Sequence, residues 1–160
     1  MSLQRINDLE EAIVLIMNMD GWQLEWCGGG FDHYDAKGLT PKGKPCVIEM
    51  KFRNKYYETK MLEKYKYDKM MEMDKDIMKL YFVNDPKANY LFWLNDIILS
   101  EPIELNCPTT TLWDQEKKPK LVYLLEETQA ILINKNDADI PQGFKEGGTN
   151  REQPSESDKK

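Results

Sequence analysis

Residues 47–52, with the sequence Val-Ile-Glu-Met-Lys-Phe, constrain the fold most because they set two charges inside an apolar run. Side chains alternate between the two faces of a strand, so Glu49 and Lys51 share one face with Val47, whereas Ile48 lies on the other. Burying a charge that has no partner costs roughly several kcal/mol. The pattern therefore predicts that Glu49 and Lys51 meet a metal ion, an opposite charge or a water-filled cleft.

A further carboxylate precedes this strand. Residues 31–36 read Phe-Asp-His-Tyr-Asp-Ala, and a connection rich in Gly, Pro and Lys joins them to residues 47–52, which favours two neighbouring strands. Alternation puts Asp32 and Asp35 on opposite sides of the first strand, so only one of them can accompany Glu49. Two carboxylates beside an ammonium group suit a metal-dependent hydrolase. The same Glu-x-Lys spacing also occurs by chance on the solvated face of an edge strand.

The composition is that of one soluble globular domain. The chain has 160 residues, of which 41% are hydrophobic and 31% charged; a chain of this length buries about two-thirds of its unfolded surface. It contains neither the run of ~20 apolar residues that a membrane helix needs nor a signal sequence, so a cytoplasmic location is expected. The net charge of −6 argues against a protein that coats nucleic acid but allows a local basic patch. The three cysteines, Cys27, Cys46 and Cys107, are expected to be reduced packing residues.

Hydrophobic periodicity predicts two helices. The first covers residues 6–19, opens near Asn7 or Asp8 and carries an apolar stripe that ends at Ile16. Glu10 lies at the edge of that stripe, so it either looks toward the body of the protein or is an exposed first-turn glutamate that the helix dipole favours. The second covers residues 58–76. Its apolar sector includes Lys66 and Lys69, which either extend to the rim or point into a polar cleft.

The remaining periodic segments predict strands. We expect strands near residues 22–27, 31–36, 47–52, 79–83 and 90–94, a strand or helix over 121–133, and irregular structure over 102–119. Residues 109–111, Thr-Thr-Thr, are either a phosphate-contacting loop or a simple turn. Low apolar content beyond Pro141 predicts a disordered tail over 141–160 after a domain over 1–140.

This order of elements resembles the PD-(D/E)XK nuclease superfamily. A helix, three strands with Asp on the second and Glu-x-Lys on the third, a further helix and a further strand match its αβββαβ core over residues 6–94. The Tyr-Asp-Ala and Val-Ile-Glu-Met-Lys motifs are most similar to small phage-type and Holliday-junction-resolvase-like members; Tyr34 stands where the family's name has Pro. The resemblance implies an α/β fold of the restriction-endonuclease type, a mixed central sheet flanked by helices.

The resemblance also implies the site. Asp35, Glu49 and a first-helix glutamate, here Glu10, would hold Mg²⁺, for which Mn²⁺ can substitute, and Lys51 would position or polarise the attacking water. Asp35 is preferred to Asp32 because Tyr-Asp-Ala matches the family motif better. Nucleic-acid contacts are expected from these side chains: Arg53, Lys55, Lys66, Lys69 and His33, the last of which also fits a packed or surface position.

The implied activity is Mg²⁺-dependent hydrolysis of DNA in recombination, repair or processing. Duplex, branched and single-stranded DNA, a homodimer, and endonuclease or exonuclease action all stay open. The rival hypothesis is a catalytically inactive DNA-binding or protein-interaction module that kept the fold. An RNA-directed nuclease is a third hypothesis that the sequence does not separate from the first.

Overall fold

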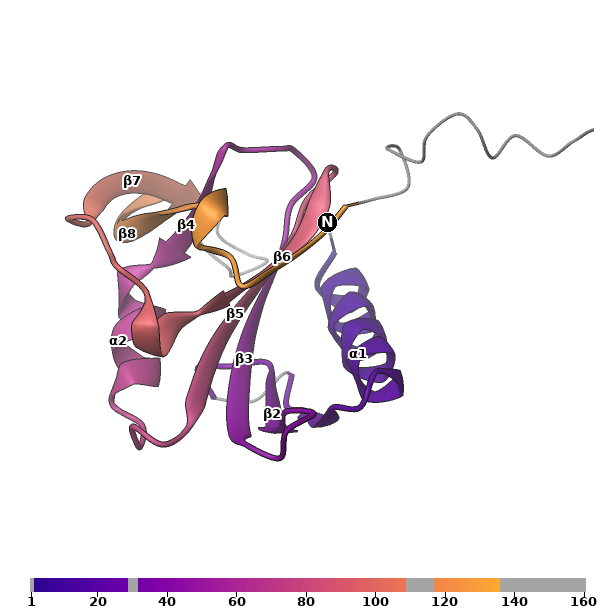
Figure 1. Cartoon of the computed structure of the whole chain (residues 1–160). Helices are drawn as coiled ribbons and strands as arrows, with labels where there is room; N and C mark the ends of the chain where they lie inside the picture. Colours follow the sequence, from indigo (N-terminus) through magenta and orange to yellow (C-terminus); the bar gives the residue numbers. More distant parts are fainter. Residues whose placement is uncertain (1, 29–31, 109–116, 136–160) are drawn as a thin grey trace, which may run out of the picture.

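The computed structural model describes residues 2–28, 32–108 and 117–135 and has three layers. A six-stranded central sheet carries helix α1 on one face and, on the other, helix α2 with a three-stranded sheet (Figure 1). The elements are α1 (Leu3–Met19), β1 (Gln23–Trp26), β2 (Ala36–Leu39), β3 (Pro45–Phe52), β4 (Thr59–Glu63), α2 (Lys64–Met71), β5 (Met78–Asn84), β6 (Ala88–Trp93), η1 (Leu94–Asp96), β7 (Ile103–Pro108), β8 (Lys117–Glu126), η2 (Glu127–Gln129) and β9 (Leu132–Lys135).

The central sheet has the strand order β1-β2-β3-β5-β6-β9. Its only parallel pair among the described strands is β3 with β5, and the other neighbours are antiparallel. Parallel neighbours need a crossover, which β4 and α2 supply between β3 and β5. The predicted mixed α/β architecture is therefore confirmed, as are the strands near residues 79–83 and 90–94.

Strand β3 is buried on both faces, as expected for a strand inside a sheet that has layers on both sides. Val47 packs into the core beneath α2 and the small sheet, whereas Ile48 and Met50 pack on the side of α1. Glu49 is only 3% exposed. The alternation predicted for residues 47–52 is thus confirmed, and it directs Glu49 toward the layer of α2.

Helix α1 begins earlier than predicted. Ser2 caps it by accepting a hydrogen bond from the backbone N–H of Arg5 (3.3 Å), so neither Asn7 nor Asp8 opens the helix. Glu10 and Val14 are buried, whereas Ile16 is 60% exposed. The predicted apolar stripe was therefore wrong at Ile16, because α1 rests on the β1 edge of the sheet and turns Ile16 away from it.

The strand predicted over residues 31–36 is displaced along the chain. Residues 33–35 form a bend, β2 covers Ala36–Leu39, and Phe31 lies outside the described residues. Gly38 permits the close pairing of β2 with β1, because a Cβ atom at this position would lie 1.9 Å from the carbonyl oxygen of Gln23. Asp35 therefore directly precedes β2 and does not lie within a strand.

The prediction of one long second helix was also wrong. Residues 59–63 form β4, and α2 is confined to Lys64–Met71. Strand β4 pairs with β8, so that Thr59 faces Glu126, and β8 in turn pairs with β7. This sheet joins segments far apart in the sequence, so local periodicity did not reveal it. Strand β7 lies in the region expected to be irregular, whereas most of β8 lies in the segment expected to be a strand or helix.

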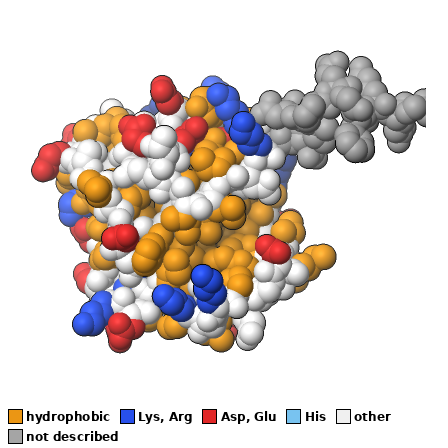
Figure 2. Space-filling model, in the orientation of Figure 1, with side chains coloured by type: hydrophobic (Ala, Val, Ile, Leu, Met, Phe, Trp, Pro, Cys, Tyr) orange, Lys and Arg blue, Asp and Glu red, His pale blue; other side chains and the backbone are white. Residues whose placement is uncertain are grey.

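Helix α1 covers only part of its face of the central sheet. Figure 2 shows hydrophobic side chains across the middle of this view, over the strands beside α1. Two hydrophobic side chains of the sheet, Trp93 and Leu132, are 36% and 59% exposed. This apolar area is a surface on which another molecule could pack.

Further predictions concern the cysteines, membrane-spanning helices and two segments of the chain. Cys27, Cys46 and Cys107 are free, as expected, and the last two are buried. Among the described helices none is both long and apolar enough to cross a membrane. Residues 109–111 and the tail over 141–160 lie outside the described residues.

Candidate active site

Asp35 and Glu49 lie together at the centre of the molecule. The backbone N–H of Asp35 donates to the carbonyl of Ile48 (2.8 Å), and its carboxylate accepts a hydrogen bond from the N–H of Met50 (2.7 Å). These two bonds fasten Asp35 across β3 on either side of Glu49. The two carboxyl groups are near enough for a hydrogen bond with Glu49 to lower the pKa of Asp35.

The electrostatics of the pair are those of crowded, buried acids. Burial raises the pKa of Glu49 to about 8, the charge of Asp35 adds to this effect, and Lys66 opposes it. Burial also raises the pKa of Asp35, against the lowering effect of the Met50 hydrogen bond. Without a bound cation the pair therefore tends to keep a proton near neutral pH, and a divalent cation would take the place of that proton.

Two lysines accompany the carboxylates. Lys66, on α2, forms an ion pair with Glu49; burial alone would lower the pKa of Lys66, but Glu49 and Asp35 raise it overall. Lys51 projects from β3, and burial followed by the charges of Arg53 and Lys66 lowers its pKa. The sequence placed Lys51 here, but it did not identify Lys66 as the partner of Glu49.

Glu10 reaches the same region from α1. Glu10 is 6% exposed, and its carboxylate accepts a hydrogen bond from Nε1 of Trp26 (3.0 Å). Burial raises the pKa of Glu10; Trp26 lowers it, Asp35 raises it further and Lys66 lowers it. Gly28 leaves room for the indole, since a Cβ atom at this position would lie 2.2 Å from the Trp26 ring. Glu10 thus looks inward, as the helical wheel predicted, but is held by Trp26.

Asp35 and Glu49 alone fit a divalent cation better than the expected set of Asp35, Glu49 and Glu10 does. Within the described ranges no group of three or more His, Cys, Asp and Glu side chains could hold a metal ion, so Glu10 is not gathered with the other two into one ligand set. Adjacent anionic oxygens are nevertheless the donors that Mg²⁺ and Mn²⁺ accept, with water or backbone carbonyls completing the shell. Asp35 and Glu49 therefore form a two-carboxylate pair with Glu10 nearby, and their role as metal ligands stays a prediction.

A cleft opens beside Lys66. Its volume is about 610 Å³, and its lining includes Asp32, His33 and Lys120. The His33 ring packs edge-on against Tyr65, with 5.6 Å between ring centroids. Asp32 is exposed on the wall of this cleft, so Asp35 rather than Asp32 accompanies Glu49.

The other predicted nucleic-acid contacts are dispersed. Arg53 lines a second cavity, of about 470 Å³, between β5 and the small sheet, and Lys55 is exposed in the segment that leads to β4. Lys69 pairs with Glu72 (3.1 Å) at the end of α2. The structure therefore brings Lys66 and His33 to the cleft but places Arg53, Lys55 and Lys69 elsewhere.

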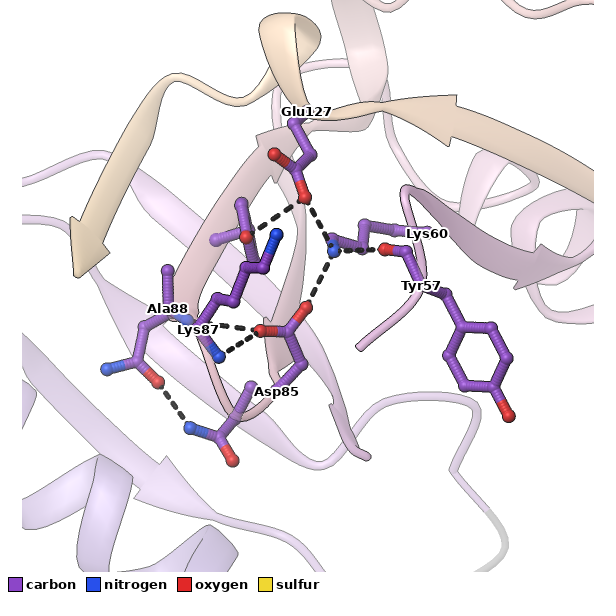
Figure 3. A network of polar contacts seen from close by, with 9 residues as sticks. Tyr57, Lys60, Asp85, Lys87, Ala88 and Glu127 are labelled. Carbon is purple, nitrogen blue, oxygen red and sulfur yellow. Dashed lines mark hydrogen bonds and ion pairs between the residues drawn. The ribbon is translucent and has the colours of Figure 1, made fainter. Parts of the chain in front are cut away.

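Sequence reasoning missed a buried ionic cluster on β4. Nζ of Lys60 contacts Asp85 (2.6 Å), Glu127 (2.9 Å) and the carbonyl of Tyr57 (2.6 Å) (Figure 3). Lys60 is only 3% exposed, and its ammonium also lies 4.2 Å from the ring centroid of Tyr90. The one local signal is a lysine on the inward side of a short strand, because its charged partners are distant in the sequence.

No protein-family model matches the sequence, and no curated protein matches it significantly. Among solved structures, the chain is similar to the Holliday junction resolvase Hjc of the archaeal hyperthermophile Archaeoglobus fulgidus. The match has a TM-score of 0.52 and 13% identity, and it covers 79% of this chain and 87% of that chain. The fold is that of the restriction endonucleases. The match confirms the expected fold, whereas the roles of the site residues stay predictions.

Proposed function

We propose that the protein is a divalent-metal-dependent nuclease that hydrolyses phosphodiester bonds of DNA, in recombination, repair or processing. One observation carries the proposal: Asp35 and Glu49 lie side by side, with Lys51 and Lys66 next to them, in a restriction-endonuclease-like fold. Buried carboxylates with raised pKa values and nearby ammonium groups are more typical of a reaction centre than of a structural core.

Asp35 and Glu49 would hold the cation, Mg²⁺ with Mn²⁺ as a substitute. When bound, such a cation neutralises charge on the phosphate and lowers the pKa of a bound water. The hydrogen bond from Met50 fixes the orientation of Asp35, and burial keeps Glu49 in one position. In this proposal Glu10 acts behind the pair, where it adds negative charge while Trp26 holds its carboxylate.

Lys51 would place a positive charge beside the scissile phosphate and orient the attacking water. A cationic group that is fixed before the reaction stabilises the charge that develops on the phosphate oxygens. Its lowered pKa arises from burial and from neighbouring cations, and an arriving phosphate would reverse this effect because opposite charges favour the charged form.

The cleft beside Lys66 would receive the DNA backbone. Lys66 and His33 line this cleft, so they are the nearest candidates for phosphate contacts. Arg53, Lys55 and Lys69 would act at a greater distance, as contacts that weaken with salt. DNA that is duplex, branched or single-stranded could be the substrate, and we retain a homodimer as part of the proposal; light scattering on the purified protein would decide the latter.

The test is cleavage of linear, circular, single-stranded and branched DNA in Mg²⁺ or Mn²⁺, with a chelator control. Glu49→Gln is the matched variant, because it keeps the shape of the side chain and removes its charge. We expect metal-dependent cleavage of at least one DNA by the wild type and none by the variant. No cleavage of any DNA at micromolar protein would contradict the proposal, and cleavage of RNA alone would redirect it to an RNA nuclease.

A second candidate is the inactive module with the same fold. The observation that favours it is the ion pair between Glu49 and Lys66, which satisfies the carboxylate without metal. Binding of Mg²⁺ distinguishes the two functions: a Glu49→Gln protein that binds Mg²⁺ as tightly as the wild type, together with DNA binding without cleavage, supports the module.

A further inference from the structure

We propose that Lys66 is the resident counter-ion of the metal site and that its ammonium group and a divalent cation occupy Glu49 alternately. The inference rests on the proposed function, since it concerns how the same site accepts its metal. It adds a role for a helix residue: Lys66 would hold the empty site together and leave it when metal arrives.

The contacts of Lys66 carry the first step. Its ammonium pairs with Glu49, whose side chain is 4% exposed, whereas the side chain of Lys66 is 35% exposed. Asp35 lies beside Glu49, because its carboxylate accepts a hydrogen bond from the N–H of Met50, the residue after Glu49. The ammonium group thus contacts a carboxylate oxygen of a residue that would hold the cation.

Simultaneous occupancy is unfavourable for steric and electrostatic reasons. A Mg²⁺ ion approaches its carboxylate oxygens to about 2.0–2.1 Å and demands a nearly ideal shell. An ammonium group in contact with the same carboxylate would lie within a few ångströms of the ion, where like charges repel strongly in a poorly solvated site. Metal binding at Glu49 therefore requires Lys66 to withdraw.

The cleft provides an alternative position for the Lys66 side chain. Lys66 lines the open cleft, as do Lys64 and Lys120, and it also lines a small cavity with Glu49 and Lys51. Lys64 pairs with Asp68 and Lys120 pairs with Glu63, so Lys66 is the lysine of this cleft whose ion-pair partner is also a proposed metal ligand. On release it would point into the cleft, where it could meet a phosphate, so metal loading would prepare the site for its substrate.

Mg²⁺ titration by calorimetry tests the exchange. The full chain is compared with Lys66→Met and Lys51→Met at about pH 9, so that protons compete little for the carboxylates. Lys51→Met removes another lysine from the same region without removing the Glu49 ion pair, so it reports the general effect of losing a neighbouring cation. We expect the Kd for Mg²⁺ to fall about tenfold or more in Lys66→Met and only about threefold in Lys51→Met. Equal changes, or weaker binding by Lys66→Met, would overturn the inference.

A spectroscopic readout separates displacement from repulsion. In the metal-free protein labelled with ¹⁵N-lysine, we expect a protected ammonium signal that Lys66→Met and Glu49→Gln both remove, and saturating Mg²⁺ should remove it from the wild type. A signal that persists in Mg²⁺ would overturn the exchange. Lys66→Gln replaces Lys66→Met if the latter fails to fold, as judged by circular dichroism.

The outcomes also separate this inference from the proposed function. Mg²⁺ that binds through Glu49 without discriminating between the lysine variants leaves the metal-dependent nuclease intact and removes only the role of Lys66. Mg²⁺ that binds none of these proteins overturns both.

Discussion

The charge state of Glu49 governs the behaviour of the candidate site. Glu49 is 3% exposed and lies beside another carboxylate, and burial raises its pKa to about 8. A group whose pKa is raised on folding binds its proton more tightly in the folded than in the unfolded state. The stability of the metal-free protein should therefore depend on pH in the direction opposite to that of a surface carboxylate held by a salt bridge.

We expect the metal-free protein to lose stability as the pH rises from about 4.5 to about 8, the unfolded and folded pKa values of Glu49. Its contribution is fully present below the first value and is lost through the second, with a slope of up to about 1.4 kcal/mol per pH unit. Glu49→Gln should flatten this slope. Chemical denaturation at several pH values in chelator checks it, and a wild-type stability that rises over this range would count against the raised pKa.

The two aspartates before β2 should behave differently. Asp35→Asn should lower metal-dependent cleavage by about 100-fold or more, because it removes a charged donor. Asp32→Asn should leave most of the activity, because Asp32 lies on the wall of the cleft. The cleavage assay compares the two proteins directly, and the reverse order of activities would show that Asp32 is the acting carboxylate.

Asp35→Asn should also keep the fold. Asn retains an oxygen that can accept the Met50 hydrogen bond, and the change removes one of two like charges that repel each other. The expected result is a melting temperature in chelator that is equal to or higher than that of the wild type. A large fall would mean that the lost activity reflects unfolding.

At the scale of the element, the pairing of β1 with β2 depends on a glycine. Gly38 has φ +154, and a Cβ atom there would meet the Gln23 backbone, which cannot rotate away as a side chain would. Because Asp35 directly precedes β2 and Trp26 ends β1, this pairing also places two residues of the candidate site.

We expect Gly38→Ala to destabilise the protein by about 1–3 kcal/mol. Gly43→Ala is the matched control: Gly43 has φ +77 but open space around its Cβ position, so only backbone strain is added. Thermal and chemical unfolding of both variants measures the difference. Equal losses would show that backbone conformation, rather than the approach of β1, decides the effect at Gly38.

At the scale of the whole molecule, the Lys60 cluster joins the two sheets. Lys60 belongs to β4 of the small sheet, whereas Asp85 follows β5 of the central sheet and Glu127 begins η2 (Figure 3). Asp85 also accepts hydrogen bonds from the N–H groups of Lys87 and Ala88. Removing the ammonium would leave a buried carboxylate without its main counter-charge.

Lys60→Met should therefore cost about 3–5 kcal/mol of unfolding free energy. Lys64→Met is the control, because the Lys64–Asp68 pair is partly exposed and within one helix, and its loss should change stability little. Denaturant unfolding of the two variants checks this. A small effect of Lys60→Met would mean that hydrophobic packing alone holds the small sheet in place.

The sequence alone determined the features that arise from local periodicity and charge. The alternation in residues 47–52, the first helix and the strands near residues 79–83 and 90–94 all follow from patterns that neighbouring residues carry. A buried strand with two embedded charges also required a polar site around Glu49, because unpaired buried charge is costly.

The tertiary structure alone decided those features that depend on contacts between residues distant in the sequence. Residues 59–63 became a strand because β8 pairs with them, although their own periodicity favoured a helix. Asp35 joined Glu49 through a bond to the Met50 backbone, and Lys66 reached Glu49 from the next layer. Local preferences amount to a fraction of a kcal/mol per residue, so a sheet ladder or a buried ion pair outweighs them once the chain has folded.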